Sequence, residues 1–303
     1  MQRDEALLEL RSHLKDLDYR FTAVSPATHA RVLDRETHAS PTLRDVFGWS
    51  RPFREHQLEP RVLELMQGAG IVRQAPDGLR SALRVSSLGE DLFYHSAYPT
   101  DDEDAVFFGP DTYRFARFIE LHLPRHSSIA LADMGAGSGV GGIWAGRLVP
   151  SAAITLVDSN PAAYELARIN ARASGRAVKL LLGDSLPHAQ DVVIANPPYM
   201  VDESKRAYRH GGDLFGGEVA LEWTRDALAK LTSGGTLLLY TGTAIVDGAS
   251  PLLSELAQVC RRAGASITCE EIDPDVFGEE LDKPAYAAVE RIAAAGIVIR
   301  APL

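Results

Sequence analysis

The pattern of hydrophobic and polar positions changes near residue 100 and predicts a different kind of structure on each side. From residue 129 onward, apolar runs of strand length alternate with segments whose apolar residues recur at helical spacing. This alternation is typical of an α/β fold, in which helices cover both faces of a doubly wound parallel sheet. The predicted strands are 129–133, 153–158, 177–182, 191–195, 235–241, 266–271 and 294–300, and the predicted helices are 139–148, 161–173, 217–231 and 250–263.

The first hundred residues have a shorter and more helical pattern. Apolar residues recur at helical spacing over 4–17, namely at Ala6, Leu7, Leu10, Leu14 and Leu17, and short helices are predicted over 26–35, 41–48 and 58–68. Two extended pieces follow, one before the turn at Asp77-Gly78 and one at Leu83-Arg84-Val85. Helices followed by a hairpin predict a small winged-helix-like domain. The predicted organisation is this domain over 1–98, a linker and cofactor-covering segment over 99–128, and the α/β domain over 129–303.

Composition and charge narrow the possible partners. The net charge is −10, with 13 basic and 14 acidic residues in 1–100 and 18 basic and 27 acidic residues in 101–303. Because phosphate backbones are bound by clustered Lys and Arg, a nucleic-acid partner is disfavoured but not excluded. An uncharged apolar run of about 18 residues is absent, so we expect no membrane contact and a cytoplasmic location. Cys260 and Cys269 are expected to be buried free thiols, and no metal site is predicted.

Three successive predicted strands end in residues suited to a nucleotide-like ligand. The first runs into the glycine-rich segment 133–139, where glycines permit a tight turn and close approach of a ligand. The second ends at Asp158, which can accept from both ribose hydroxyls, and the third at Asp184, which can accept from an adenine amino group. Alone, the loop could hold a dinucleotide and each acid could cap a helix or turn. Together they predict a cofactor site of Asp133, Gly135, Ala136, Gly137, Gly139, Asp158, Ser159, Asp184, Ser185 and Asn196.

The fourth strand brings Asn196-Pro197-Pro198-Tyr199 to the same sheet edge, and this is the most specific signal in the chain. An amide or amino nitrogen next to a π-system is a poor nucleophile because its lone pair is delocalised, so two acceptors must hold its N–H bonds. The Asn196 side-chain oxygen and the Pro197 carbonyl can be these acceptors, and the prolines keep the turn extended. Tyr199 is expected to lie against the planar group, with Pro198 beside it. We therefore predict Asn196, Pro197 and Tyr199 as catalytic residues, the alternative being a plain strand-terminating turn.

Residues 105–245 resemble the class I methyltransferases with an Asn-Pro-Pro-Tyr (NPPY) motif, especially the HemK/PrmC-type protein-glutamine methyltransferases and their small-domain relatives. The resemblance is carried by the glycine loop, the acids ending the second and third strands, and the tetrapeptide 196–199. It implies a Rossmann-like, seven-stranded sheet with S-adenosylmethionine as cofactor. The segment 107–113 is similar to one that closes over the cofactor in the family, but it lacks the family's arginine. Gly211 and Gly212 are similar to glycines that flank the family's substrate pocket, or they serve only as lid glycines.

These observations give one leading hypothesis and two alternatives. The leading hypothesis is methyl transfer from S-adenosylmethionine to a glutamine side-chain amide of a protein. The same acceptor pair could hold an adenine N6 or guanine N2 amino group of RNA or DNA, which the basic cluster Lys205, Arg206, Arg209 and His210 would support. The third is a nucleic-acid-binding regulator that senses S-adenosylmethionine without chemistry. The N-terminal domain does not match the helical bundle with which bacterial enzymes of this type grip release factors. As a winged helix it could bind DNA, cover the substrate or form a homodimer.

Overall fold

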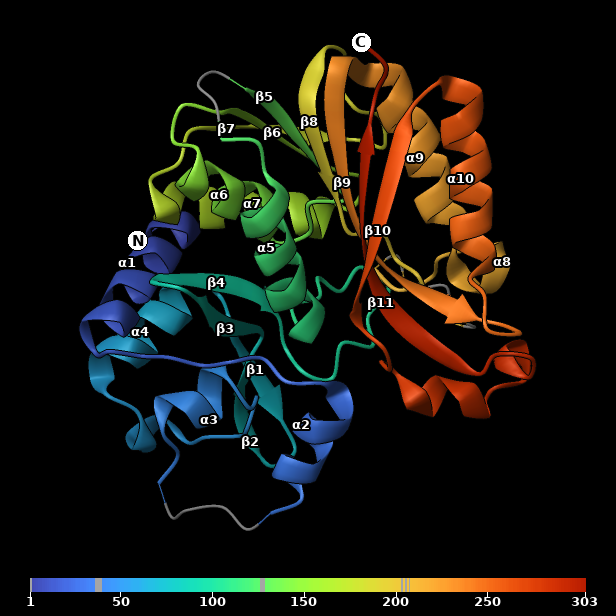
Figure 1. The fold of residues 1–303 in the computed structure, drawn as a ribbon. Coiled ribbons are helices and arrows are strands. Elements are labelled where there is room, and N and C mark those ends of the chain that lie inside the picture. Colours follow the sequence, from blue (N-terminus) through green and yellow to red (C-terminus); the bar gives the residue numbers. More distant parts are fainter. Residues whose placement is uncertain (1, 36–39, 126–128, 203, 205, 207) are drawn as a thin grey trace.

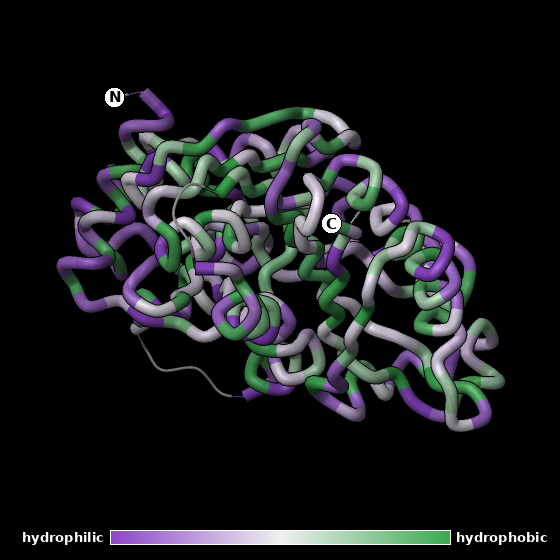
Figure 2. Tube along the Cα trace, turned by 45° about the horizontal axis from the view of Figure 1, so that its top comes forward, coloured by the Kyte–Doolittle hydropathy of each residue, from purple (hydrophilic) through white to green (hydrophobic). Residues whose placement is uncertain are grey.

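The protein consists of an N-terminal module of helices and hairpins and a larger part in which one sheet lies between two layers of helices (Figure 1). Its computed structural model describes residues 2–35, 40–125, 129–202, 204, 206 and 208–303. Apolar residues are frequent in the middle of the molecule, and polar residues are frequent along its periphery (Figure 2). Within the described residues, no helix is both long enough and apolar enough to cross a lipid bilayer.

The larger part is built on a seven-stranded sheet of the doubly wound α/β type, as predicted. Its strand order is β10-β11-β9-β8-β5-β6-β7. β11 runs in the opposite direction to the other six strands, which are parallel to one another. The strands are β5 (Ala130–Met134), β6 (Ala153–Asp158), β7 (Val178–Leu182), β8 (Gln190–Ala195), β9 (Leu231–Ile245), β10 (Ser266–Asp273) and β11 (Arg291–Arg300). All seven coincide with predicted strands, and β9 and β11 are longer than the pattern indicated.

Helices cover both faces of this sheet because its central strands are apolar on both sides. Ile194 of β8 packs in one hydrophobic cluster with α5, α6 and α7, whereas the preceding residue, Val193, packs in another with α9 and α10. Successive strand residues point to opposite faces, so a continuous apolar run fills both layers. The helices are α5 (Pro110–His122), α6 (Val140–Leu148), α7 (Pro161–Ser174), α8 (Asp213–Gly216), α9 (Glu218–Lys230) and α10 (Pro251–Ala263).

Two features of the larger part differ from the sequence expectations. The stretch described as a linker and covering segment contains the 13-residue helix α5, whose Phe115, Phe118 and Ile119 are buried against the sheet. The expectation of two buried thiols was wrong for one of them, since Cys260 is buried but Cys269 is exposed. Cys269 lies on β10, the edge strand of the sheet, where most side chains are solvent-exposed.

The N-terminal module contains four α-helices and two β-hairpins among the described residues. Its elements are α1 (Arg3–Asp16), α2 (Pro26–Leu33), α3 (Leu43–Phe47), α4 (Pro60–Gly68), β1 (Val72–Ala75), β2 (Gly78–Ser81), β3 (Leu83–Leu88) and β4 (Asp91–Ser96). The predicted partner of the first extended piece was wrong: β1 pairs with β2, and residues 83–85 belong to a second hairpin with β4. Leu17 lies beyond the end of α1 and is exposed, unlike the four apolar residues before it. The winged-helix assignment stays a prediction.

A buried amide joins this module to the larger part. The side chain of Asn170 on α7 accepts a hydrogen bond from the Tyr94 backbone N–H at 2.9 Å. It also donates to the carbonyl oxygens of Tyr94 at 3.0 Å and Ser138 at 2.9 Å. One side chain therefore connects α7 with β4 and with the glycine-rich loop after β5. Apolar residues of α7, including Leu166 and Ile169, belong to the hydrophobic cluster of the N-terminal module.

We expect Asn170→Ala to lower the free energy of unfolding by about 2–4 kcal/mol, because it leaves three buried backbone groups without partners. Urea unfolding followed by circular dichroism measures this change. The matched control is Gln258→Ala on α10, where the amide hydrogen-bonds only a neighbouring Glu255 side chain. The control should change the free energy of unfolding by less than about 0.5 kcal/mol. Equal unfolding midpoints for the two variants would contradict the bridging role of Asn170.

Candidate functional site

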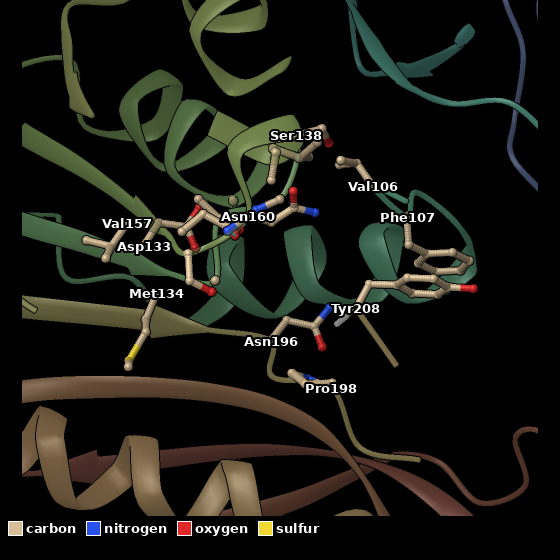
Figure 3. A pocket seen from close by; sticks show the side chains of 18 of the residues that line it. Val106, Phe107, Asp133, Met134, Ser138, Val157, Asn160, Asn196, Pro198 and Tyr208 are labelled. Atoms are coloured by element: carbon tan, nitrogen blue, oxygen red, sulfur yellow. Dashed lines mark hydrogen bonds between the residues drawn. The ribbon is translucent and has the colours of Figure 1, made fainter. Parts of the chain in front are cut away.

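A cavity of about 240 Å³ lies at the carboxyl ends of β5, β6 and β8. The sheet changes its winding direction here, because β5 has β6 on one side and β8 on the other. Open α/β sheets bind their ligands at such a point, where loops from neighbouring strands diverge. The predicted site residues on the cavity wall are Asp133, Gly135, Ala136, Gly137, Asp158, Ser159, Asp184, Asn196 and Pro198 (Figure 3).

The glycine-rich loop has the left-handed backbone that its sequence suggested. Gly135 and Gly137 have φ values of 67° and 55°, a region that residues with a Cβ rarely adopt. Asp158 holds this loop in place, because its Oδ2 accepts from the Gly137 N–H at 2.8 Å and its Oδ1 accepts from the Asn160 N–H at 2.9 Å. Burial raises the pKa of Asp158. The carboxylate thus organises the loop while facing the cavity.

Asp133 is a second, more deeply buried acid beneath the same loop. It is the penultimate residue of β5, is 2% exposed, and accepts a hydrogen bond from the Gly142 N–H at 2.7 Å. Burial raises its pKa to about 7, an effect that the Gly142 hydrogen bond opposes. Asp133 therefore changes its protonation state near neutral pH.

The turn after β8 carries an unpaired acceptor beside the cavity. Asn196 Oδ1 is buried and accepts no hydrogen bond from any described residue. Asn196 and Pro198 lie on the wall, whereas Pro197 between them is buried behind it. A buried carbonyl oxygen without a partner is unfavourable by about 1–3 kcal/mol, so this atom beside the cavity is a candidate acceptor for a ligand N–H. In Figure 3 the Asn196 side chain extends from the turn toward Tyr208.

Several predicted site residues lie behind the wall. Gly139 begins α6 with φ 80°, and Ser185 follows Asp184 outside the cavity. Tyr199, expected to lie against a planar ligand, is 8% exposed and donates its phenolic hydrogen to Asp111. Gly211 packs on the turn itself: a Cβ at this position would lie 2.7 Å from the Pro198 carbonyl oxygen. Gly212 is likewise absent from the wall, and its Cβ would meet the Glu218 carboxylate.

Among the described residues, four aromatic side chains line the wall, Phe107, Phe115, Tyr208 and Trp223, and none of them was predicted as an individual site residue. Phe107 and Tyr208 stack with ring centroids 5.6 Å apart and an interplanar angle of 5° (Figure 3). The Tyr208 hydroxyl donates to the Thr100 carbonyl oxygen at 2.8 Å. Phe107 lies in the segment that resembles a cofactor-covering sequence, so its place at the cavity could have been predicted from the sequence. Tyr208 lies in a loop without periodicity, and only the folded chain brings it to Phe107.

The basic cluster after the turn is largely neutralised. Arg206 forms an ion pair with Asp202 at 2.6 Å, and Arg209 forms one with Glu280 at 2.5 Å. The hydrogen bond from Arg206 lowers the pKa of Asp202 to about 2, so this carboxylate stays charged at neutral pH. His210 lies in the same loop, and Lys205 lies outside the described residues. These arginines are therefore engaged within the protein and offer little positive charge to a phosphate.

Comparison with known proteins gives a family match over the same region. The family model described as "Methyltransferase small domain" matches residues 106–263, just over half of the chain. A release factor glutamine methyltransferase of Deinococcus radiodurans is 31% identical over 60% of this chain and 66% of its own length. A ribosomal RNA large subunit methyltransferase G of Streptomyces griseus subsp. griseus is 33% identical over 33% of this chain and 31% of its own length.

The matched segment thus spans just under two thirds of the first relative and about a third of the second. Among solved structures, wild-type Trm5b from Pyrococcus abyssi superposes with a TM-score of 0.52, at 14% identity, over 82% of this chain and 68% of that one. At this identity the likeness concerns the fold. It agrees with the mostly parallel seven-stranded sheet.

Asp133 gives a testable pH dependence of stability. Its pKa is higher in the folded protein than in an unfolded chain, so between about pH 4 and 7 the native state holds a proton that the unfolded state has released. The free energy of unfolding must therefore fall as pH rises through this window. Asp133→Asn should remove this slope and gain about 1–3 kcal/mol relative to wild type between pH 5 and 8. Parallel urea-unfolding profiles of the two proteins across that range would rule out the pKa shift.

Proposed function

The chain belongs to the methyltransferase small-domain family, and from this premise we propose that it methylates the side-chain amide nitrogen of a glutamine in a protein. The methyl donor is S-adenosylmethionine, and the protein is a class I methyltransferase. The observation that carries the proposal is the unpaired, buried Asn196 Oδ1 at the cavity. This atom needs a donor N–H, which a primary amide has.

The residues at the sheet edge fit S-adenosylmethionine. Asp158 can accept from the ribose hydroxyls, and Asp184 from the adenine amino group. The glycine loop leaves room for the methionine part, since a Cβ at Gly137 would meet only Val106, at 4.0 Å. When bound, the cofactor supplies a methyl group on a sulfonium, which is open to in-line displacement. The protein's part is to hold the acceptor nitrogen.

Asn196 and Pro197 hold that nitrogen in the proposed mechanism. The Asn196 side-chain oxygen accepts one N–H of the amide. The Pro197 carbonyl, which is bonded to the wall residue Pro198, accepts the other, and together they direct the nitrogen lone pair toward the methyl group. Both residues precede a proline and are restricted to extended backbone, so the acceptors are oriented before the substrate arrives. Alignment of this kind can contribute roughly 7–11 kcal/mol to lowering a barrier. The positive charge that develops on nitrogen is lost with a proton after transfer.

Charge near the cavity favours a protein over a nucleic acid. Asp101, Asp102, Glu103 and Asp104 are exposed and immediately precede Ala105, which lies on the cavity wall. The Asp104 carbonyl oxygen accepts from the Asn160 side chain, which also lines the cavity. Carboxylates at the rim repel a phosphate backbone. Arg206 and Arg209 are engaged by acids, so the described part of the loop after the turn offers little compensation.

A second candidate is methylation of an amino group in ribosomal RNA, adenine N6 or guanine N2. It is supported by relatives named for the large-subunit RNA, at 33–36% identity in Streptomyces griseus subsp. griseus and Ectopseudomonas mendocina. The same two acceptors could hold an exocyclic amino group. The remaining hypothesis, a regulator that senses S-adenosylmethionine without chemistry, lacks support from the family. Homodimer formation by the N-terminal module stays a prediction.

The deciding experiment supplies S-adenosylmethionine carrying a tritiated methyl group together with either a purified translation release factor or large-subunit ribosomal RNA. We expect label in the release factor that is released by protease and is stable to nuclease. Label confined to the RNA would overturn the proposed acceptor class and favour the second candidate. Mass spectrometry of proteolytic peptides from the labelled protein should then identify a glutamine methylated on its side-chain amide nitrogen.

For Asn196→Ala we expect kcat to fall by at least about 100-fold with the Kd for S-adenosylmethionine changed by less than about 5-fold. The reason is that one of the two acceptors for the reacting nitrogen is lost, while the ribose and adenine contacts remain. Single-turnover methyl transfer and isothermal titration calorimetry measure the two quantities. A wild-type kcat for this variant would contradict the mechanism.

Asp158→Ala should weaken binding of S-adenosylmethionine, which Asn196→Ala is expected to leave nearly unchanged. We expect the Kd for S-adenosylmethionine to rise by about 10–100-fold, because the net loss of one hydrogen bond to a charged acceptor is worth roughly 1.5–3 kcal/mol and the variant also frees the Gly137 N–H. Calorimetry with the donor alone measures this, so no acceptor is needed. An unchanged Kd would remove Asp158 from the cofactor site.

A further inference from the structure

A buried carboxylate on α5 fastens the turn that carries Asn196. Asp111 is 4% exposed and lies in the first turn of the helix. Its Oδ2 accepts from the Tyr199 hydroxyl, and its Oδ1 accepts from the Tyr240 hydroxyl of β9 at 2.7 Å. Arg114, one turn along α5, donates to the same Oδ1 at 3.1 Å and is held in turn by Asp273 at 2.7 Å. The phenol of Tyr199 is thus part of a buried charged network.

The Tyr199 ring is enclosed on several sides. A Cβ at Gly242 of β9 would lie 2.3 Å from the ring, and the Phe277 ring meets it edge-on at 5.9 Å. A Cβ at Gly216 would lie 2.3 Å from the Tyr199 carbonyl oxygen, so the backbone is packed as closely as the ring. Burial and the charge of Asp111 raise the pKa of the Tyr199 phenol well above its usual range, so it keeps its proton and donates.

The turn needs such an anchor because of its own sequence. Pro197 and Pro198 have no N–H, so the backbone between Asn196 and Tyr199 cannot be held by its own donors. The next backbone donor fixed in place is Met200, whose N–H bonds the Arg209 carbonyl oxygen at 2.9 Å. The side chain of Tyr199 therefore supplies a tether that the prolines cannot.

Aromatic side chains other than Tyr199 nevertheless line the cavity, and Tyr208 is one of them. Tyr208 lines the same cavity as Asn196 and Pro198 and is stacked on Phe107 (Figure 3). Its hydroxyl is directed to the Thr100 carbonyl oxygen, and the Arg206 guanidinium lies 5.8 Å from its ring centroid. Tyr208 is therefore held in position, with its ring at the wall.

We propose that Tyr199 is a positioning residue, which Asp111 locks behind the wall so that the turn stays aimed, and that Tyr208 supplies the aromatic surface against the methyl acceptor. The inference rests on the proposed transfer to a planar nitrogen. It assigns Asp111 and Tyr208 to roles in that reaction, one through Tyr199 and the other by direct contact with the acceptor.

Tyr199→Phe separates an anchor from a stacking surface, because it keeps the ring and removes the hydroxyl. We expect kcat for methylation of a release factor to fall by about 10-fold or more while the Kd for S-adenosylmethionine stays within about 2-fold. The matched control is Tyr19→Phe, which deletes a buried hydroxyl that donates to the Val85 carbonyl at 2.8 Å in the N-terminal module. This control should keep kcat. A Tyr199→Phe enzyme with wild-type kcat overturns the anchor.

Asp111→Asn tests whether the carboxylate acts through Tyr199. Its amide can accept from the phenols through one oxygen only, so we expect a loss of kcat similar to that of Tyr199→Phe. In the double variant the two losses should not multiply, because both remove the same contact. Multiplying losses would show that Asp111 does not act through Tyr199 and would overturn its assignment.

Tyr208 is tested by a graded pair of variants. Tyr208→Phe keeps the ring and should leave the KM for the acceptor within about 2-fold, whereas Tyr208→Ala should raise it by about 10-fold or more. The Kd for S-adenosylmethionine should stay nearly constant in both. An unchanged acceptor KM for Tyr208→Ala would overturn the role of Tyr208.

Two further measurements separate failure of this inference from failure of the proposed function. If Asn196→Ala is inactive while Tyr199→Phe is fully active, only the anchor is wrong. Hydrogen exchange needs no acceptor: exchange at the Met200 and Gly211 amides should accelerate by about 10-fold or more in Tyr199→Phe and not in Tyr19→Phe. Unchanged exchange overturns the anchor even if release factor and RNA both prove not to be substrates.

Discussion

The change of winding direction at β5 determines where the sheet can bind a ligand. Because β5 has β8 on one side and β6 on the other, the chain leaves these strands toward opposite faces and opens a gap at their carboxyl ends. The glycine loop, Asp158 and Asn196 each follow one of these strands, so residues more than sixty positions apart share one cavity.

Buried polar contacts then fix parts of the site that the sheet alone leaves free. Asn170 ties the glycine loop to β4 of the N-terminal module, and Asp111 ties the proline-rich turn to α5 and β9. Such contacts hold geometry because a buried polar group that loses its partner is strongly unfavourable. Both ties involve elements outside the loops that carry the chemistry. The N-terminal module and α5 are therefore structural supports of the site, whatever else they bind.

The placement of the aromatic residues changes how the tetrapeptide is interpreted. Tyr199 belongs to the motif, but its ring is enclosed and its hydroxyl is occupied. Tyr208 belongs to no motif, yet it lies on the cavity wall against Phe107. The pairing of Arg206 and Arg209 with acids likewise removes the support that a basic cluster gave to phosphate binding. In each case the sequence showed which type of side chain is present, but only the folded structure showed which residue it contacts.

The sequence by itself determined the sheet, the position of the cavity and most of its polar wall. Alternating apolar runs specify strands through local periodicity, and a glycine loop or an acid at a strand end needs only the parallel direction of the strands to be placed. The tertiary structure decided which side chains of the loops face the cavity, because Tyr199 and Asp111 are 88 residues apart and Phe107 and Tyr208 are 101 apart. Contacts across such distances depend on how whole elements pack, and neither periodicity nor spacing records that packing.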